Sequence, residues 1–199
     1  MIYIDIVFED PLSGAVISKL LSCYDKFSIR YSYNIGGFVK IKKNIKGYNN
    51  ASKHTPYFVL TDLDKKKCAP ELISEWITFQ KHPNLLFRVA VREVESWLLA
   101  DREGFSDFAK VNLMEIPVKP DEIADPKLKL LEIIKKSKDR ALKDDILSRY
   151  YGKIGPNYNG KLSEFVNDSW DIERAVENSP SLNRTHKRLV EFQYISNES

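Results

Sequence analysis

The amino-acid sequence predicts an α/β fold, in which a mostly parallel sheet flanked by helices is followed by a C-terminal helical annex. Up to about residue 110, short apolar segments rich in β-branched residues alternate with segments of helical periodicity. Strands that alternate with helices are joined by crossover connections, which make neighbouring strands parallel. From Asp125 onward only helical patterns occur. We therefore expect an α/β domain over residues 1–110 and a helical annex, packed on it, over residues 125–199.

Four segments of the first half are expected to form strands. Each is short, largely apolar and bounded by polar or turn-forming residues, as strands buried on both faces are. They are Ile2–Phe8, Phe27–Tyr33, Tyr57–Thr61 and Leu85–Val91.

Helices are expected after the first, third and fourth strands. Asp10-Pro11 is typical of a helix start, and the helical spacing of apolar residues continues from there to about Tyr24. The other two helices are expected over Ala69–Gln80 and Glu93–Ala100. After the second strand, glycines and asparagines interrupt a lysine-rich connection over residues 36–50, for which the pattern predicts no single element.

The second half is expected to contain four helices separated by turn residues: Lys127–Ser137, Arg140–Tyr151, Leu162–Trp170 and Leu182–Phe192. A boundary between the sheet half and the helical half is expected within residues 111–124, which contain two prolines.

Composition points to a globular protein of the cytoplasm. The chain is 43% hydrophobic and 30% charged, and it has no apolar run long enough to span a membrane. The first ten residues contain acids and no basic leader, which argues against a secretory signal. Cys23 and Cys68 are expected to be reduced and mostly buried thiols. The three histidines are too scattered to form a zinc site.

Charge is segregated along the sequence although the net charge is only +3. Residues 26–61 carry seven basic and no acidic side chains, and residues 126–161 carry ten basic and four acidic ones. Between them, residues 62–125 hold nine basic and thirteen acidic side chains. The pattern suits an acidic metal site flanked by surfaces that bind a polyanion, although solvated lysines would give the same pattern.

Acidic residues follow three of the expected strands. Glu9 comes after the first, Asp62 and Asp64 after the third, and Glu93 and Glu95 after the fourth. Ligands of open parallel sheets collect at the carboxyl ends of the strands, so these side chains are expected to converge. Carboxylates without histidine or cysteine select Mg²⁺ or Mn²⁺. We expect such an ion at Glu9, Asp62 and Asp64, with Leu63 turned toward the core.

Several of these acids also have a purely structural interpretation. Asp10 fits a helix cap better than a metal ligand. Glu93 and Glu95 are equally well explained as acids of a first helical turn, where the helix dipole favours them. Asp5, inside a strand, fits a polar network, and Asp101 either ends the preceding helix or approaches the other acids.

At these positions the sequence resembles the Toprim domain of topoisomerases, primases and OLD-type nucleases, over about residues 2–100. Glu9 matches the glutamate that ends the family's first strand, and Asp62 and Asp64 match its Asp-x-Asp pair. More narrowly, the chain resembles an uncharacterised bacterial branch of Toprim-like proteins that looks associated with ABC-type ATPases in phage defence. The segments that carry this narrower resemblance are 62–64, 68–70, 92–101, 125–127 and 179–182.

The chain departs from the family pattern at two places. Asp10 stands where the common pattern has a glycine after the glutamate, and Ser13 stands where OLD-type nucleases carry a second acid. A complete two-metal site would then need Glu93 or Glu95 as a substitute. No tyrosine can be singled out as a strand-passing nucleophile, so topoisomerase activity is not expected.

The resemblance and the acids together predict a metal-dependent nuclease, a hydrolase of DNA or RNA, that works with an ABC-type ATPase. Glu9, Asp62, Asp64, Glu93 and Glu95 are its expected catalytic residues. Expected contacts to the nucleic acid are Lys40, Lys42, Lys43, Lys46, Lys65 and Arg92, beside the aromatic residues Tyr31, Tyr33, Phe38 and Tyr48.

Two other functions stay open. The first is a non-catalytic sensor or regulatory subunit of such a complex, which the serine at position 13 favours. The second is a different phosphoryl-transfer enzyme that acts on nucleotides. The sequence contains no Walker-type glycine-rich loop, so hydrolysis of nucleoside triphosphates by this chain is not expected.

Overall fold

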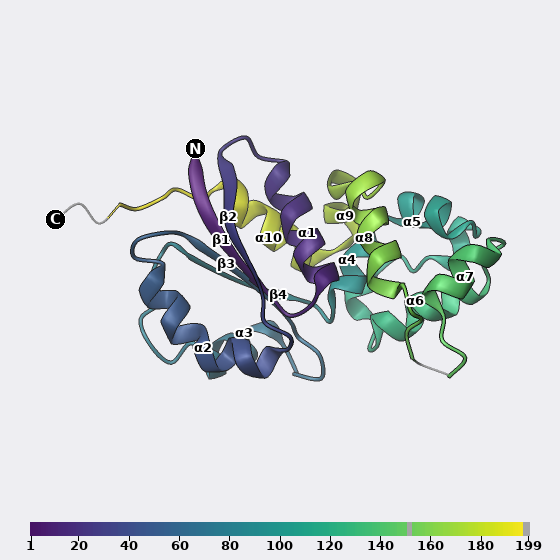
Figure 1. The fold of residues 1–199 in the computed structure, drawn as a ribbon, viewed down its shortest axis with the longest axis horizontal. Helices are drawn as coiled ribbons and strands as arrows, with labels where there is room; N and C mark the ends of the chain where they lie inside the picture. Colours follow the sequence, from purple (N-terminus) through teal and green to yellow (C-terminus); the bar gives the residue numbers. More distant parts are fainter. Residues whose placement is uncertain (151–152, 197–199) are drawn as a thin grey trace.

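The computed structural model describes residues 1–150 and 153–196. Its centre is a sheet of four parallel strands, β1 (Ile2–Phe8), β2 (Phe27–Asn34), β3 (Tyr57–Asp62) and β4 (Leu85–Ala90). Their order across the sheet is β2-β1-β3-β4 (Figure 1). The predicted α/β fold with a parallel sheet is confirmed, and all four expected strands form within one residue of their expected ends.

The strand order reverses between β1 and β3. From β1 the chain passes through α1 (Pro11–Ser22) to β2, on one side, and then returns through α2 (Phe38–Ala51) to β3 on the other side of β1. Right-handed crossovers in opposite directions place their helices on opposite faces. Accordingly α1 lies on one face of the sheet, and α2 and α3 (Ala69–Trp76) lie on the other (Figure 1).

The two faces of the sheet belong to two separate hydrophobic clusters. Ile6 and Phe58 pack in the larger cluster, with α1, whereas their neighbours Val7 and Val59 pack in the smaller one, with α2 and α3. This alternation follows from the pleat of a strand, which turns successive side chains to opposite faces. Because both faces are covered there, the central strands β1 and β3 are largely apolar, whereas the edge strand β2 is exposed from Arg30 to its end.

The lysine-rich connection after β2 is a helix, α2, which the sequence analysis did not assign. Its buried side chains are Ile41, Ile45 and Asn49, spaced four residues apart on one face, and the lysines lie on the others. Gly47 lies within the helix, where the space around it is open. The predicted interruption at the glycines and asparagines was wrong because burial of this narrow stripe outweighs their low helix propensity.

Two predicted helices are shorter than expected. Helix α3 ends at Trp76 instead of Gln80, because Ile77 leaves the helical conformation with φ −107° and ψ 77°. The helix predicted over Arg140–Tyr151 is α7 (Arg140–Ile146), and Tyr151 lies outside the described residues. Leu147 already has extended backbone angles and pairs with Ile154 in an isolated bridge.

After β4 the described residues contain more helices than predicted. The expected ones form as α4, α6, α7, α8 and α10, and the sequence analysis missed α5 and α9. Gly104 in α5 is needed because a side chain there would clash with the carboxylate of Asp101, which caps the helix. The bounds not yet given are α4 Val94–Ala100, α5 Arg102–Ala109, α6 Pro126–Lys135, α8 Tyr158–Asp168, α9 Ile172–Asn178 and α10 Pro180–Val190, with short 3₁₀ turns at Leu113–Glu115 and Pro120–Glu122.

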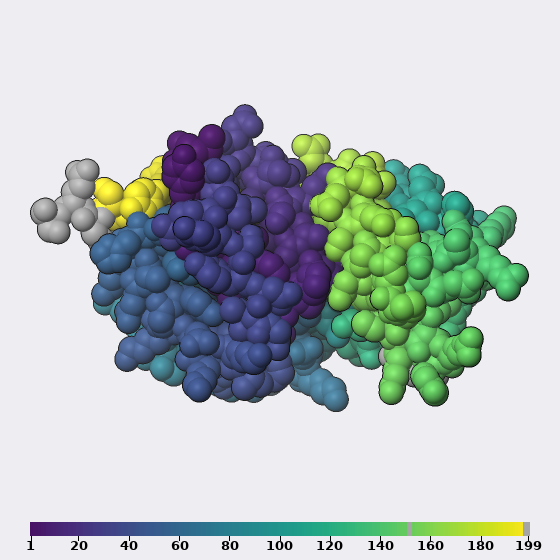
Figure 2. All heavy atoms as spheres, viewed as in Figure 1, coloured from purple at the N-terminus to yellow at the C-terminus, as the bar shows by residue number. Residues whose placement is uncertain are grey.

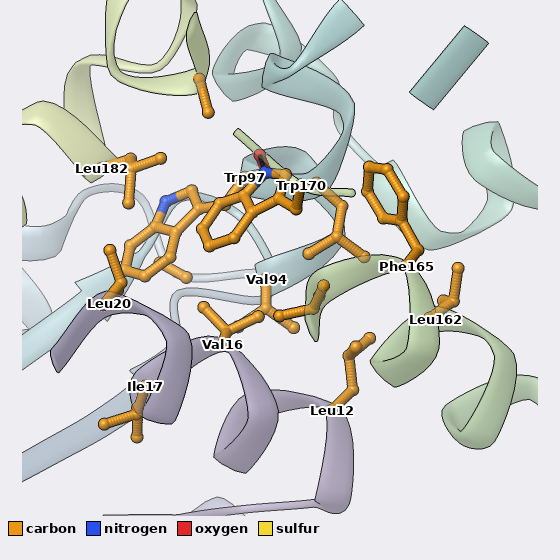
Figure 3. Close-up of a cluster of buried hydrophobic side chains, with 14 of the residues drawn as sticks. Leu12, Val16, Ile17, Leu20, Val94, Trp97, Leu162, Phe165, Trp170 and Leu182 are labelled. Atoms are coloured by element: carbon orange, nitrogen blue, oxygen red, sulfur yellow. Dashed lines mark hydrogen bonds between the residues drawn. The ribbon is translucent and has the colours of Figure 1, made fainter. Parts of the chain in front are cut away.

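One cluster of buried side chains joins the helical half to the sheet. The close-up shows apolar residues of α1, α4 and α8 around Trp97 and Trp170 (Figure 3). Both indole N–H groups are satisfied, since Trp97 donates to Ser181 Oγ at 2.7 Å and Trp170 donates to the Trp97 carbonyl at 3.1 Å. The space-filling view shows the segment of α8 directly against the N-terminal part of the chain, on the surface near α1 (Figure 2).

Both cysteines are free, but Cys23 and Cys68 are exposed, so the prediction of buried thiols was wrong. Each sits at the end of a helix, as the C-cap of α1 and the N-cap of α3, where the backbone reaches the surface. Within the described residues, no helix has the length and apolar character needed to cross a bilayer.

Candidate functional site

The acidic residues predicted from the sequence gather at the carboxyl edge of the sheet. Glu9 follows the last residue of β1, and Asp62 is the last residue of β3. These two strands are neighbours, and the strand order reverses between them. In open α/β sheets, the crevice outside such a reversal is where ligands bind. Residues 53 positions apart in the sequence therefore meet at the position that the fold favours for a ligand.

Glu9 contacts the end of β3 directly. Its Oε1 accepts hydrogen bonds from Thr61 Oγ1 at 2.5 Å and from the N–H of Asp62 at 3.2 Å. Burial raises the pKa of Glu9, and the negative charges of Asp64 and Asp10 add to this effect, while the two hydrogen bonds oppose it.

Asp62 connects β3 to the N-terminus of α4. Its Oδ1 accepts a hydrogen bond from the N–H of Val94 at 3.1 Å, at the end of the helix whose dipole favours a negative charge. The pKa of Asp62 nevertheless lies well above its usual range, because burial and the nearby carboxylates of Glu95 and Glu9 all disfavour its charge.

Glu93 and Glu95 complete the cluster from the start of α4. Glu93 Oε2 accepts a hydrogen bond from the N–H of Lys127 at 3.0 Å, and burial followed by repulsion from Glu95 raises its pKa to about 7. Glu95 is only 2% exposed. Its Oε1 accepts from the Tyr158 hydroxyl at 2.7 Å, whereas its Oε2 is buried without a hydrogen-bond partner. Such an orphaned carboxylate oxygen is costly unless a cation or another donor reaches it.

The side chains of Lys127 and Tyr158 also belong to the acidic cluster, and the sequence analysis did not predict this. The ammonium of Lys127 lies 3.4 Å from Glu95 Oε1. Burial lowers its pKa, but the carboxylates of Glu95, Glu93 and Asp62 outweigh burial and raise it above the ordinary value. A signal for Lys127 existed, since a lysine in the first turn of a helix opposes the helix dipole and needs a compensating partner. The local sequence around Tyr158 gives no such signal.

Asp64 lies beside the cluster and is exposed. It adopts a positive φ of 49°, and Leu63 is buried, as expected for an Asp-x-Asp sequence that leaves a strand. The guanidinium of Arg92 donates to the backbone carbonyls of Asp64 at 3.1 Å and Lys66 at 3.0 Å. Arg92, expected to contact nucleic acid, therefore holds the loop after β3 in place.

The structural interpretations of three other acids are confirmed, since Asp10 caps a helix, Asp5 belongs to a polar network and Asp101 ends α4 as its C-cap residue. Asp10 caps α1 by accepting from the backbone N–H groups of its first turn, and the Ser13 hydroxyl also donates to it at 3.0 Å. Asp5 is buried and receives two hydrogen bonds from Arg30. Asp101 caps α5 and is likewise paired with an arginine of α9, at 2.7 and 3.0 Å. None of these pairs involves the carboxylates of the cluster.

The lysines predicted to bind nucleic acid are divided between two surroundings. Lys40, Lys43 and Lys46 are exposed on α2. Lys42 and Lys65 line a pocket of about 600 Å³ between α2, the loop after β3, and α3. Of the aromatic residues, Tyr31, Tyr33 and Phe38 are exposed, and Tyr48 stacks on Tyr57 at 5.8 Å.

The carboxylate cluster has the ligand chemistry of a hard divalent cation. In the part of the chain that the structure describes, however, no three or more histidine, cysteine, aspartate or glutamate side chains are arranged so that they could hold a metal ion. The donors themselves suit Mg²⁺, because they are oxygens only, they repel one another, and one buried oxygen of Glu95 has no partner. These residues would have to turn toward a common ion to bind it.

Comparison of the chain with protein-family models, with curated proteins and with solved structures finds no match.

Proposed function

We propose that this protein is a metal-dependent nuclease that hydrolyses phosphodiester bonds of DNA or RNA in the cytoplasm, with Mg²⁺ or Mn²⁺ as cofactor and an ABC-type ATPase as partner protein. One observation carries the proposal: Glu9 and Asp62 are in direct contact at the point where the strand order reverses, in a cluster of carboxylates whose pKa values are raised. Clustered groups with perturbed pKa values in a crevice are typical of catalytic sites.

The resemblance to Toprim domains supports the same proposal. A parallel sheet with acids after its first and third strands is the arrangement that this resemblance implies. The proposed association with an ABC-type ATPase and with phage defence follows from that resemblance.

In the proposed mechanism Asp62, Asp64 and Glu9 would hold the ion, and Glu93 and Glu95 would complete or orient its shell. A bound divalent cation polarises the phosphate and lowers the pKa of its water. Glu9, a half-buried carboxylate with a raised pKa, would accept the proton of the attacking water if it does not itself ligate the ion. The water oxygen would then bond to phosphorus as the bond from phosphorus to the leaving oxygen breaks, and that oxygen would take a proton from solvent.

A second candidate function is a non-catalytic regulatory subunit with the same fold. The observation that favours it is the position of Lys127, whose ammonium already neutralises part of the acidic cluster. A cluster that contains its own cation has less need of a metal. In this case the acids would stabilise the contact between α4 and α6 instead of binding a substrate.

Exchange of Asp62 for asparagine tests the proposal, since it keeps the acceptor for the Val94 N–H and removes one charge. We expect cleavage of short DNA and RNA substrates with Mg²⁺ or Mn²⁺ to fall about 10²-fold or more. In EDTA the variant should be as stable as the wild type or more stable, because carboxylate repulsion is reduced. The matched control is Asp168→Asn, at an exposed aspartate outside the cluster.

Three outcomes separate the candidates. Lost cleavage with unchanged or raised stability supports the nuclease. Unchanged cleavage in the Asp62→Asn variant would refute the proposed role of this residue and, with it, the site. If neither protein cleaves any substrate while the variant gains stability, the regulatory subunit is the better description.

A further inference from the structure

The pocket between α2 and α3 adjoins the carboxylate cluster. Asp62 lines this pocket, while its Oδ1 accepts the N–H that opens α4 on the other side of the strand end. Asp64 lines the same pocket. A ligand in this pocket of about 600 Å³ therefore lies next to the residues proposed to hold the metal ion.

The pocket wall is apolar and aromatic. Leu63 and Leu72 form part of it, and the rings of Phe38 and Trp76 lie nearly parallel, with centroids 6.4 Å apart and 21° between their planes. Trp76 is 5% exposed, but Phe38, the first residue of α2, is 45% exposed. A large ring left in water at the mouth of an apolar pocket offers a surface on which a flat aromatic ligand can stack.

Three lysines and three acidic residues line the pocket. Lys42 and Lys66 both pair with Glu75, each at 2.5 Å, so one carboxylate serves two ammonium groups. Lys65 also lines the pocket, and no ion pair within the described residues involves it. Lys65 therefore offers a positive charge to the phosphate of a ligand beside the aromatic wall.

We propose that this pocket binds an unpaired nucleobase, so that the substrate is single-stranded nucleic acid or a strand with an extruded base. The inference rests on the proposed function for its substrate class. An aromatic wall suits a base, Lys65 suits a neighbouring phosphate, and the next phosphate would reach the metal ion proposed at the adjoining aspartates. A simple anion would not gain from contact with the apolar wall, and a base stacked inside a duplex cannot enter the pocket.

Trp76 is a reporter for this binding. The chain has three tryptophans, and Trp97 and Trp170 are 0% and 2% exposed in the core away from the pocket. We expect a five-nucleotide single strand of oligothymidylate, added in EDTA, to quench the fluorescence of Trp76. A fully abasic strand of the same length should bind about tenfold more weakly, because base stacking contributes about 1–3 kcal/mol per base. Trp76→Phe should remove the signal.

Phe38→Ala should weaken binding of the base-containing strand about tenfold, measured by fluorescence anisotropy of a labelled strand. Its matched control is Val39→Ala, the next residue of α2, which is 64% exposed and does not line the pocket. Equal affinities for the base-containing and abasic strands, or equal effects of the two substitutions, would overturn the proposal. So would tighter binding of a duplex of the same length.

The test separates this proposal from the proposed nuclease activity. The Asp62→Asn variant is expected to bind the single strand in EDTA at least as tightly as the wild type, since it loses a negative charge near the phosphates. Base-dependent binding without cleavage would support the base-binding pocket and refute the proposed nuclease activity. Cleavage that is equally fast on single and double strands and unaffected by Phe38→Ala would retain the nuclease and refute the pocket.

Discussion

Exchange of Glu93 for glutamine is expected to stabilise the protein at pH 8 and to have little effect at pH 5. Glu93 is half-buried beside Glu95, and these surroundings raise its pKa from 4.5 to about 7. Glutamine has nearly the same shape, and its carbonyl oxygen can accept the N–H of Lys127 that Glu93 accepts at 3.0 Å. The substitution therefore removes a charge and leaves the hydrogen bond available.

The sign and size of the effect follow from proton linkage. Between pH 4.5 and 7 the folded state holds a proton on Glu93 that the unfolded state has lost, so the free energy of unfolding falls as pH rises through this window. A shift of the Glu93 pKa from 4.5 to about 7 corresponds to a loss of about 3 kcal/mol in the free energy of unfolding once Glu93 is ionised. Solvent screening of a half-buried group reduces this to about 1–2 kcal/mol. The gain in unfolding free energy of the glutamine variant over the wild type should be complete at pH 8.

The assay is urea unfolding of both proteins at pH 5, 6, 7 and 8, in EDTA so that no divalent ion compensates the charge. Glu177→Gln, at an exposed carboxylate of α9, is the matched control and should change stability by less than about 0.5 kcal/mol at every pH. A Glu93→Gln variant less stable than the wild type at pH 8, or a difference that is the same at all four pH values, would refute the argument that burial and Glu95 oppose the charge of Glu93.

Two further substitutions test buried ion pairs, one in the acidic cluster and one outside it. Lys127→Met should destabilise the protein by about 3 kcal/mol at pH 8, because it leaves the buried Glu95 without its cation. The loss should be smaller at pH 5, where Glu93, whose pKa is raised to about 7, is protonated and no longer repels Glu95. An equal loss at both pH values, measured by urea unfolding, would contradict this. Arg174→Met should cost about 3 kcal/mol, since the fully buried Asp101 loses both hydrogen bonds of the guanidinium. Lys138→Met, at an exposed lysine, is the control for both substitutions. If Arg174→Met destabilises the protein no more than this control does, the backbone N–H groups are sufficient partners for Asp101.

The predictable part of the fold is the part that local patterns describe. The strand over Ile2–Phe8 and the cap at Asp10 follow from short-range signals, a β-branched apolar run and a capping residue before proline, and both are confirmed. Helix α2 was missed because its glycine and asparagines have low helix propensity, whereas its stability depends on burying Ile41 and Ile45 against the sheet.

Local sequence patterns also predicted part of the site. Glu9 and Asp62 could be placed together because parallel strands end at one edge, so their positions after apolar runs were sufficient. The contact of Glu9 with Thr61 and the N–H of Asp62 agrees with that expectation. The burial of Glu95 could not be derived in this way, because an acid in a first helical turn is usually exposed.

The sequence by itself determined which segments become strands and helices and which acids follow them, because propensity, capping and periodicity act over a few neighbouring residues. Only the tertiary structure decided that Lys127 and Tyr158, 32 and 63 residues after Glu95, enter the acidic cluster. It also decided that Arg92 braces a loop and that Phe38 and Trp76 meet across a pocket. The physical reason is that these contacts depend on how α6, α8, α2 and α3 pack, and packing is set by the whole core at once.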